Sequence, residues 1–100
     1  MEKLAEKRAE IFRIFSNAKR VLIFWVLVDG ELAVNEIAGA INSSIQNTSQ
    51  HLRIMKDNNI LESRRDGTAI YYRIADNETG EYCRMIHEQS LKELELLPSQ

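Results

Sequence analysis

Apolar side chains recur at helical spacing in two segments at the start of the chain. In residues 2–15 they form one stripe, made by Leu4, Ile11, Ile14 and Phe15. Residues 18–28 are apolar on nearly every side, which is typical of a central, buried helix. Ser16 or Asn17 stands where the N-cap of that second helix is expected. The chain therefore opens with two predicted helices.

A short and a longer helix are predicted next, joined by a tight turn. Asp29-Gly30 ends the apolar helix, and residues 31–33 are short enough to be extended. Residues 35–41 form the short helix and Asn42-Ser43 the turn. Ser44 then caps a helix that continues to about residue 57, with its buried side formed by Ile45, Leu52, Met55 and the methyl group of Thr48.

The period then changes from helix to strand. Residues 60–65 and 68–74 alternate and are rich in β-branched and aromatic side chains. Asp66-Gly67 between them predicts a hairpin closed by a type I′ turn. Residues 81–97 return to helical spacing, and Pro98 follows. The predicted order is α-α-α-α-β-β-α: one mainly helical domain, residues 1–100, with a small β-hairpin. The sizes match a winged helix-turn-helix.

Composition narrows the class of protein. The hydrophobic fraction of 44% and the charged fraction of 28% are ordinary for one folded domain. The single cysteine, Cys83, cannot form an intramolecular disulfide, which fits a reducing compartment. The N-terminus does not resemble a signal peptide, and the longest apolar run, residues 21–28, is far below the roughly 20 residues that span a bilayer. We expect a cytoplasmic protein without a membrane partner.

The charge is unevenly distributed. The formal net charge of −2 counts against a nucleic-acid binder. However, residues 1–20 carry six basic and three acidic side chains, and residues 46–75 carry five and three, whereas residues 76–100 carry two and six. A local basic surface on an acidic chain is compatible with DNA binding.

The predicted fourth helix and the hairpin carry side chains suited to DNA. Asn, Gln, Ser and Arg hydrogen-bond base edges, the N-terminus of a helix attracts phosphate, and arginines on a wing reach a phosphate or the minor groove. A polar helix face is more often simply solvated, so the prediction also depends on the order of elements. For His51, a phosphate contact and a local packing role both remain open. The candidate DNA-binding residues are Ser44, Gln46, Asn47, Ser49, Gln50, His51, Arg53, Arg64, Arg65 and Thr68.

Three motifs together resemble the ArsR/SmtB family of bacterial repressors. They are Ser-x-His-Leu at residues 49–52, Arg-Arg-x-Gly at residues 64–67 and Tyr-Tyr-Arg-Ile at residues 71–74, and the resemblance covers about residues 20–74. Ser43 and Thr48 depart from the family, which often has apolar residues there. The resemblance implies a repressor that binds a palindromic operator as a homodimer through its first and last helices. The expected interface residues are Leu4, Ile11, Phe15, Tyr82, Met85, Ile86 and Gln89.

The sequence offers little for a sensor site. Many members of this family bind metals through a Cys-x-Cys motif, but the corresponding residues 31–36 contain no cysteine. Cys83 and His87, at positions i and i+4, are the candidate metal ligands, although two ligands are too few for a tetrahedral site. Alternatively, Cys83 is a small buried hydrophobe and His87 an ordinary surface residue. No other cofactor is predicted.

Two other functions compete with DNA binding. The acidic pI also suits a winged-helix module that binds protein rather than DNA. An enzyme is disfavoured, because the sequence offers no nucleophile–base pair, phosphate loop or paired acids. We therefore expect a non-enzymatic regulator whose partners are double-stranded DNA and a second copy of the chain.

Overall fold

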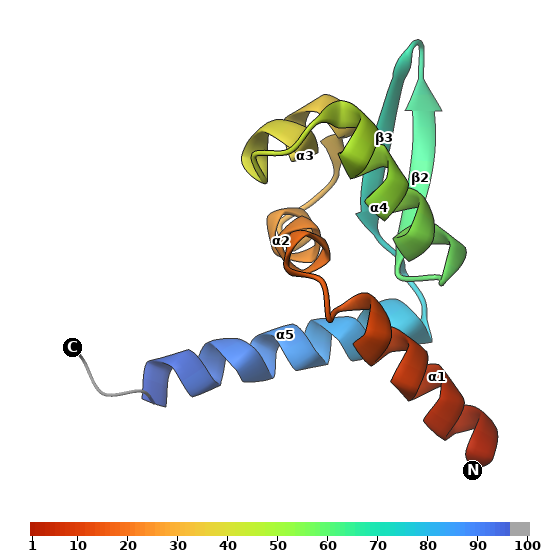
Figure 1. Cartoon of the computed structure of the whole chain (residues 1–100), viewed down its shortest axis with the longest axis vertical. Helices are drawn as coiled ribbons and strands as arrows, with labels where there is room; N and C mark the ends of the chain where they lie inside the picture. The colour runs from red at the N-terminus through yellow and green to blue at the C-terminus, as the bar shows by residue number, and fades with distance from the viewer. Residues whose placement is uncertain (97–100) are drawn as a thin grey trace.

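The computed structural model describes residues 1–96 and has the predicted architecture of a winged helix-turn-helix (Figure 1). Residues 97–100, which include Leu97 and Pro98 of the predicted end of the last helix, lie outside the described residues. The elements are α1 (Glu2–Ile14), α2 (Ala18–Leu27), β1 (Leu32–Ala33), α3 (Val34–Ala40), α4 (Ile45–Asp57), β2 (Leu61–Asp66), β3 (Ala69–Ile74) and α5 (Glu78–Leu96).

Side-chain caps begin three of the helices. The Asn17 side chain, rather than that of Ser16, accepts hydrogen bonds from the backbone N–H groups of Lys19 and Arg20 and so caps α2. Ser44 caps α4 as predicted, because its Oγ accepts from the N–H of Asn47 at 3.0 Å. Asn77 Oδ1 accepts from the N–H of Gly80 at 2.8 Å, which starts α5 at Glu78, three residues earlier than expected.

The hairpin belongs to a three-stranded antiparallel sheet of order β1-β3-β2. The extended segment before α3 forms β1 and pairs with β3, with Leu32 opposite Tyr72. At the wing tip Asp66 pairs with Ala69, so the two loop residues are Gly67 and Thr68. Gly67 has a positive φ of 64° and Thr68 does not. The predicted type I′ turn is therefore wrong: glycine at the first central position alone is the type II′ arrangement.

The core lies between the helix-turn-helix and the base of the sheet. Its fully buried side chains come from α1, α2, α3, α4, the residue before β2 and the first residue of β2, and they include Ile14, Ile23, Leu27, Ile37, Leu52, Met55, Ile60 and Leu61. Helix α2 is central as expected, but Leu22 and Trp25 are exposed, so it is not buried on every side. Ile45 is also exposed, which corrects its predicted place on the buried side of α4.

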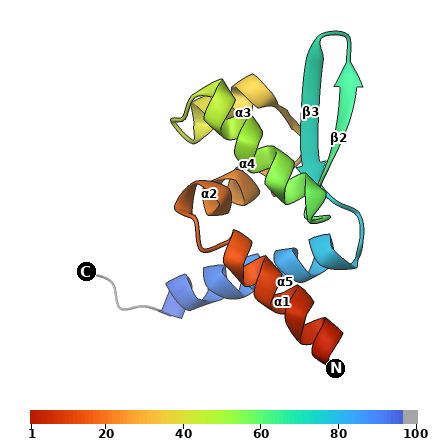
Figure 2. The same ribbon diagram turned by 45° about the vertical axis from the view of Figure 1, so that its right-hand side comes forward.

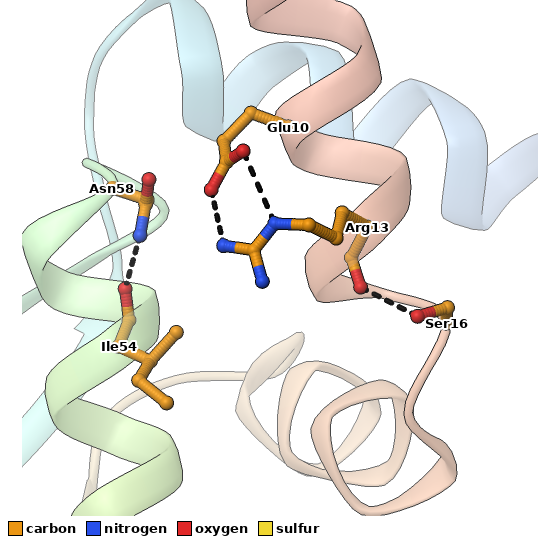
Figure 3. A network of polar contacts seen from close by, with 5 residues as sticks. All are labelled: Glu10, Arg13, Ser16, Ile54 and Asn58. Atoms are coloured by element: carbon orange, nitrogen blue, oxygen red, sulfur yellow. Dashed lines mark hydrogen bonds and ion pairs between the residues drawn. The ribbon is translucent and has the colours of Figure 1, made fainter.

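Helices α1 and α5 lie at the end of the molecule opposite the wing tip (Figures 1 and 2). Figure 3 shows three local contacts: Glu10 pairs with Arg13 on the surface of α1, Ser16 donates to the carbonyl of Arg13 at 2.6 Å, and the Asn58 side chain donates to the carbonyl of Ile54 at 2.8 Å. The backbone N–H of Asn58 donates to the same carbonyl at 3.2 Å, so Asn58 closes the C-terminus of α4 with two hydrogen bonds to one oxygen. No helix within residues 1–96 combines the length and the apolar character needed to cross a membrane.

Replacing Thr48 by valine is expected to stabilise the protein by about 1 kcal/mol, because a buried hydroxyl without a hydrogen bond is costly. Thr48 is 0% exposed, and its Oγ1 has no hydrogen-bond partner within the described chain. Valine keeps the shape and removes the polar atom. Urea denaturation of both proteins measures the change. The control is Thr68→Val at the exposed wing tip, which should give no gain; an equal gain at both positions would contradict the explanation.

Candidate nucleic-acid interface

The turn between α3 and α4 is held by a lysine from α2. Lys19 Nζ donates to the carbonyl oxygens of Ile41, at 2.6 Å, and of Asn42, at 3.2 Å. Asn42 has a positive φ of 55°, a conformation that asparagine tolerates better than most residues. These contacts connect α2 to the turn, and the capped first turn of α4 follows directly. Sequence reasoning missed Lys19, whose role depends on partners 22 and 23 residues away.

The outward face of α4 has the polar residues that the sequence predicts. Thr48, Leu52 and Met55 are buried, at spacings of four and three, and they set the rotation of the helix. The opposite side is exposed and holds Gln46, Asn47, Ser49, Gln50 and Arg53. Four of these, together with Ile54, line one hollow along α4. Ser44 is exposed beside them, but its Oγ already accepts the capping hydrogen bond.

His51 is half-buried and contacts α2 within the chain. Its Nδ1 accepts a hydrogen bond from Arg20 Nε at 3.2 Å. This contact supports a local packing role for His51 rather than a phosphate contact. Burial lowers the pKa of His51 below its usual value, and the positive charges of Arg20 and Lys19 lower it further. The neutral ring is therefore the form that the folded chain favours.

Stability should fall on acidification through this histidine. The pKa of His51 is lower in the folded chain than in the unfolded chain, so the unfolded chain binds the proton more readily. The folded protein therefore has its full stability above the pKa of the unfolded chain and loses stability as the pH falls from there through the pKa of the folded chain. His51→Gln keeps an acceptor for Arg20 but cannot be protonated. Urea denaturation between neutral and mildly acidic pH should thus show a smaller loss for the variant than for the wild type. Identical pH dependence in both proteins would refute this assignment.

The two arginines at the wing lie on opposite faces of the hairpin. Neighbouring strand residues point to opposite sides, so Arg64 shares a face with its partner Tyr71, and Arg65 with Ile70. Ile70 lines a hollow between the wing and α4 that also contains Ser49 and Thr68. Arg65 therefore belongs to the face of the wing that borders α4, and Arg64 to the other face.

Arg64 is already paired within the chain. Its guanidinium binds the Glu31 carboxylate through Nε, at 2.9 and 3.1 Å, and through Nη2, and it lies 4.6 Å from the Tyr71 ring centroid. The hydrogen bond from Arg64 lowers the pKa of Glu31, and the same bond raises the pKa of Arg64. Arg73 and Glu62 form a second ion pair at 2.7 Å on that face. The outer face of the wing is thus largely neutralised.

Arg53 and Arg65 differ from these paired arginines. Both are exposed, and neither forms an ion pair with another residue between positions 1 and 96. One stands on the outward face of α4 and the other near the wing tip. These two cations, the polar face of α4 and the free N–H groups of its first turn form a surface suited to phosphate and base edges.

The predicted dimer residues divide by exposure. Leu4, Met85 and Gln89 are exposed, whereas Phe15, Tyr82 and Ile86 are half-buried. The Arg8 guanidinium lies 3.3 Å from the Tyr82 ring centroid. Ile11 is only 6% exposed and belongs to the core of the chain, so little of it remains for a partner. Leu94, on the apolar stripe of the last helix, is also exposed, and sequence reasoning missed three further exposed apolar residues of the same helices, namely Phe12, Leu91 and Leu96.

Cys83 and His87 both lie along a small apolar hollow between α2 and α5. Burial raises the pKa of the Cys83 thiol to about 11, which favours the thiol over the metal-binding thiolate. The His87 ring lies 6.0 Å, between centroids, from both Phe24 and Trp25, and its Nδ1 is buried without a partner in the described residues. Within residues 1–96, no three His, Cys, Asp or Glu side chains gather as a metal site would require.

A capped recognition helix beside an arginine-bearing hairpin defines a winged helix-turn-helix regulator, and comparison with known proteins identifies the family. The chain belongs to the ArsR/SmtB family of transcriptional regulators. It is 34% identical over 89 residues to the HTH-type transcriptional regulator MJ1325 of Methanocaldococcus jannaschii, covering 88% of this chain and 99% of that protein. No protein-family model matches the chain.

Two further similarities support this assignment. The chain is 41% identical over 69 residues to the HTH-type transcriptional regulator KmtR of Mycobacterium tuberculosis, which covers 69% of this chain and 52% of KmtR. The chain spans about half the length of KmtR and of several other curated relatives. Its fold matches the homodimeric winged helix-turn-helix DNA-binding domain of Mb0332 from Mycobacterium bovis, with a TM-score of 0.82 and 28% identity, over 99% of this chain and 92% of that domain.

Proposed function

We propose that this protein is a transcriptional repressor that binds a palindromic DNA operator as a homodimer. The observation that carries the proposal is the outward polar face of α4, whose first turn is capped by Ser44. It is flanked by a wing bearing Arg65, which forms no ion pair with the rest of residues 1–96. Such a helix fits the major groove, where Asn, Gln and Arg side chains distinguish base pairs. A regulator of this kind works where the DNA is, which in a bacterial or archaeal cell is the cytoplasm.

The terminal helices support the homodimer. Large apolar side chains are exposed on α1 and α5, among them Phe12, Met85 and Leu94. Exposed apolar surface of this kind favours association. The similar domain of Mb0332 is homodimeric, and a homodimer of this chain would carry two α4 helices. A two-fold axis then requires a palindromic operator.

The test is selection of DNA by the intact protein from a random duplex pool, followed by affinity measurements at several salt concentrations. We expect one enriched palindromic sequence, bound with an affinity that falls as salt rises. Gln50→Ala should change which sequence is enriched, because this side chain stands on the outward face of α4. If no sequence is enriched and binding is insensitive to salt, the proposal is wrong. Equal losses of Gln50→Ala on selected and random DNA would remove Gln50 from the base-reading residues.

A further inference from the structure

One large apolar side chain stands at the start of α4, where it contributes little to the core. Ile45 is the first residue of this helix and is 58% exposed. The other exposed large hydrophobic side chains within residues 1–96 belong to Met1, α1, α2 or α5. Within residues 1–96, Ile45 is therefore the one exposed large hydrophobic side chain that belongs to the helix-turn-helix, α3 and α4.

The start of the helix does not itself require isoleucine at this position. Ser44 supplies the helix cap, so the residue after it need only adopt helical backbone angles. A β-branched side chain has a lower helix propensity than many polar residues. Exposing so much apolar surface to water is also unfavourable. An apolar partner outside the chain would explain the residue.

The surroundings of Ile45 indicate where that partner lies. Ile45 lines the hollow between α4 and the wing, together with Ser49, one turn further along the helix, and Ile70 of β3. Gln46 follows it on the exposed face. The side chain thus stands at the wing-side edge of the proposed DNA-reading surface, in the first turn of the helix, and the first residues of such helices contact base edges.

The major groove of DNA offers one apolar group, the C5-methyl of thymine. We propose that Ile45 reads this methyl group at one thymine of each operator half-site. The inference rests on the DNA-binding function proposed above and adds a base preference to it. Gln46, Ser49 and Gln50 provide hydrogen bonds beside it, whereas Ile45 provides the apolar contact.

Deoxyuridine tests the contact directly, because it differs from thymidine only by this methyl group. The sequence selected by the wild-type protein is synthesised with each thymine replaced in turn, and affinities are measured by fluorescence anisotropy for the wild type and Ile45→Ser. At one thymine of each half-site, we expect replacement by uracil to lower the affinity of the wild-type protein about fourfold, which is the effect of burying one methyl group. Ile45→Ser should bind the thymine and uracil duplexes equally.

Two variants serve as controls. Gln46→Ala removes the adjacent polar side chain and should keep the fourfold response to the methyl group. Ile45→Val keeps a branched apolar surface and should retain part of the response. Both Ile45 variants should unfold at the same urea concentration as the wild type, because the side chain is exposed.

The outcomes separate this inference from the function on which it rests. A selected sequence that tolerates uracil at every thymine would overturn the role of Ile45 and leave DNA binding intact. If Ile45→Ser loses as much affinity as the wild type when thymine is replaced by uracil, another residue makes the methyl contact, and the role of Ile45 is overturned as well. Failure to select any sequence would overturn the proposed function, and the inference with it.

Discussion

Replacing Gly80 by alanine is expected to destabilise the protein by about 3 kcal/mol, the upper part of the usual range for forcing extra atoms into a packed site. A Cβ on the buried Gly80 would lie 1.9 Å from the carbonyl oxygen of Ala75 and 2.9 Å from its carbonyl carbon. Both atoms are backbone, and Ala75 is held by a hydrogen bond from its N–H to the carbonyl of Ile60. The start of α5 would therefore have to move away from the end of β3.

Gly39→Ala is the matched control for this prediction. Gly39 is an exposed residue of α3, and a Cβ there would meet no atom within 4 Å. Alanine should stabilise that helix by about 0.5–1 kcal/mol. Urea denaturation at one fixed protein concentration measures both variants, since association would add to the apparent stability. A Gly80→Ala protein as stable as the wild type would show that the close approach of α5 to Ala75 is not required.

Arg65→Ala is expected to weaken DNA binding about tenfold, whereas Arg64→Ala should change it by about twofold or less. Arg65 is exposed and forms no ion pair within the described chain, so it is free to contact a phosphate. Arg64 already binds Glu31 on the other face of the wing. The two substitutions remove the same charge from neighbouring positions, so any difference between them reports on local contacts.

Salt dependence provides the measurement that tests this difference. Loss of one phosphate contact should lower the slope of log affinity against log salt by about 0.9. We expect this decrease for Arg65→Ala and not for Arg64→Ala. Glu31→Gln should strengthen binding modestly, because it releases Arg64 and removes a negative charge. Equal losses and equal slopes for the two arginine variants would mean that DNA displaces Glu31 from Arg64.

The sequence predicts the features that depend on local spacing. The buried side of α4 follows from Thr48, Leu52 and Met55 at helical intervals, and its start from the cap at Ser44. Once these are known, Ser49, Gln50 and Arg53 between them are expected to face outward, whereas the contact of His51 with Arg20 of α2 depends on the fold. The family resemblance adds the dimer and the operator, which no pattern within one chain contains.

Features that depend on contacts distant in sequence could not be predicted in this way. The difference between Arg64 and Arg65 depends on Glu31, 33 residues from Arg64. The turn type depends on the register in which Asp66 pairs with Ala69, which a dipeptide signal does not specify. Ile45 stands at the first position of its helix, where periodicity constrains a side chain least, and its exposure is known only from the fold.

The contact between α2 and α5 also provides an optical signal within the protein. Trp25 is the only tryptophan in the chain and is partly exposed, and its ring lies 6.0 Å from that of His87. Indole emission responds to the polarity and motion of its surroundings, so fluorescence from this one residue reports on how α5 sits against α2. A label-free spectrum could thus follow rearrangement at this end of the molecule while DNA is titrated onto α4 at the other.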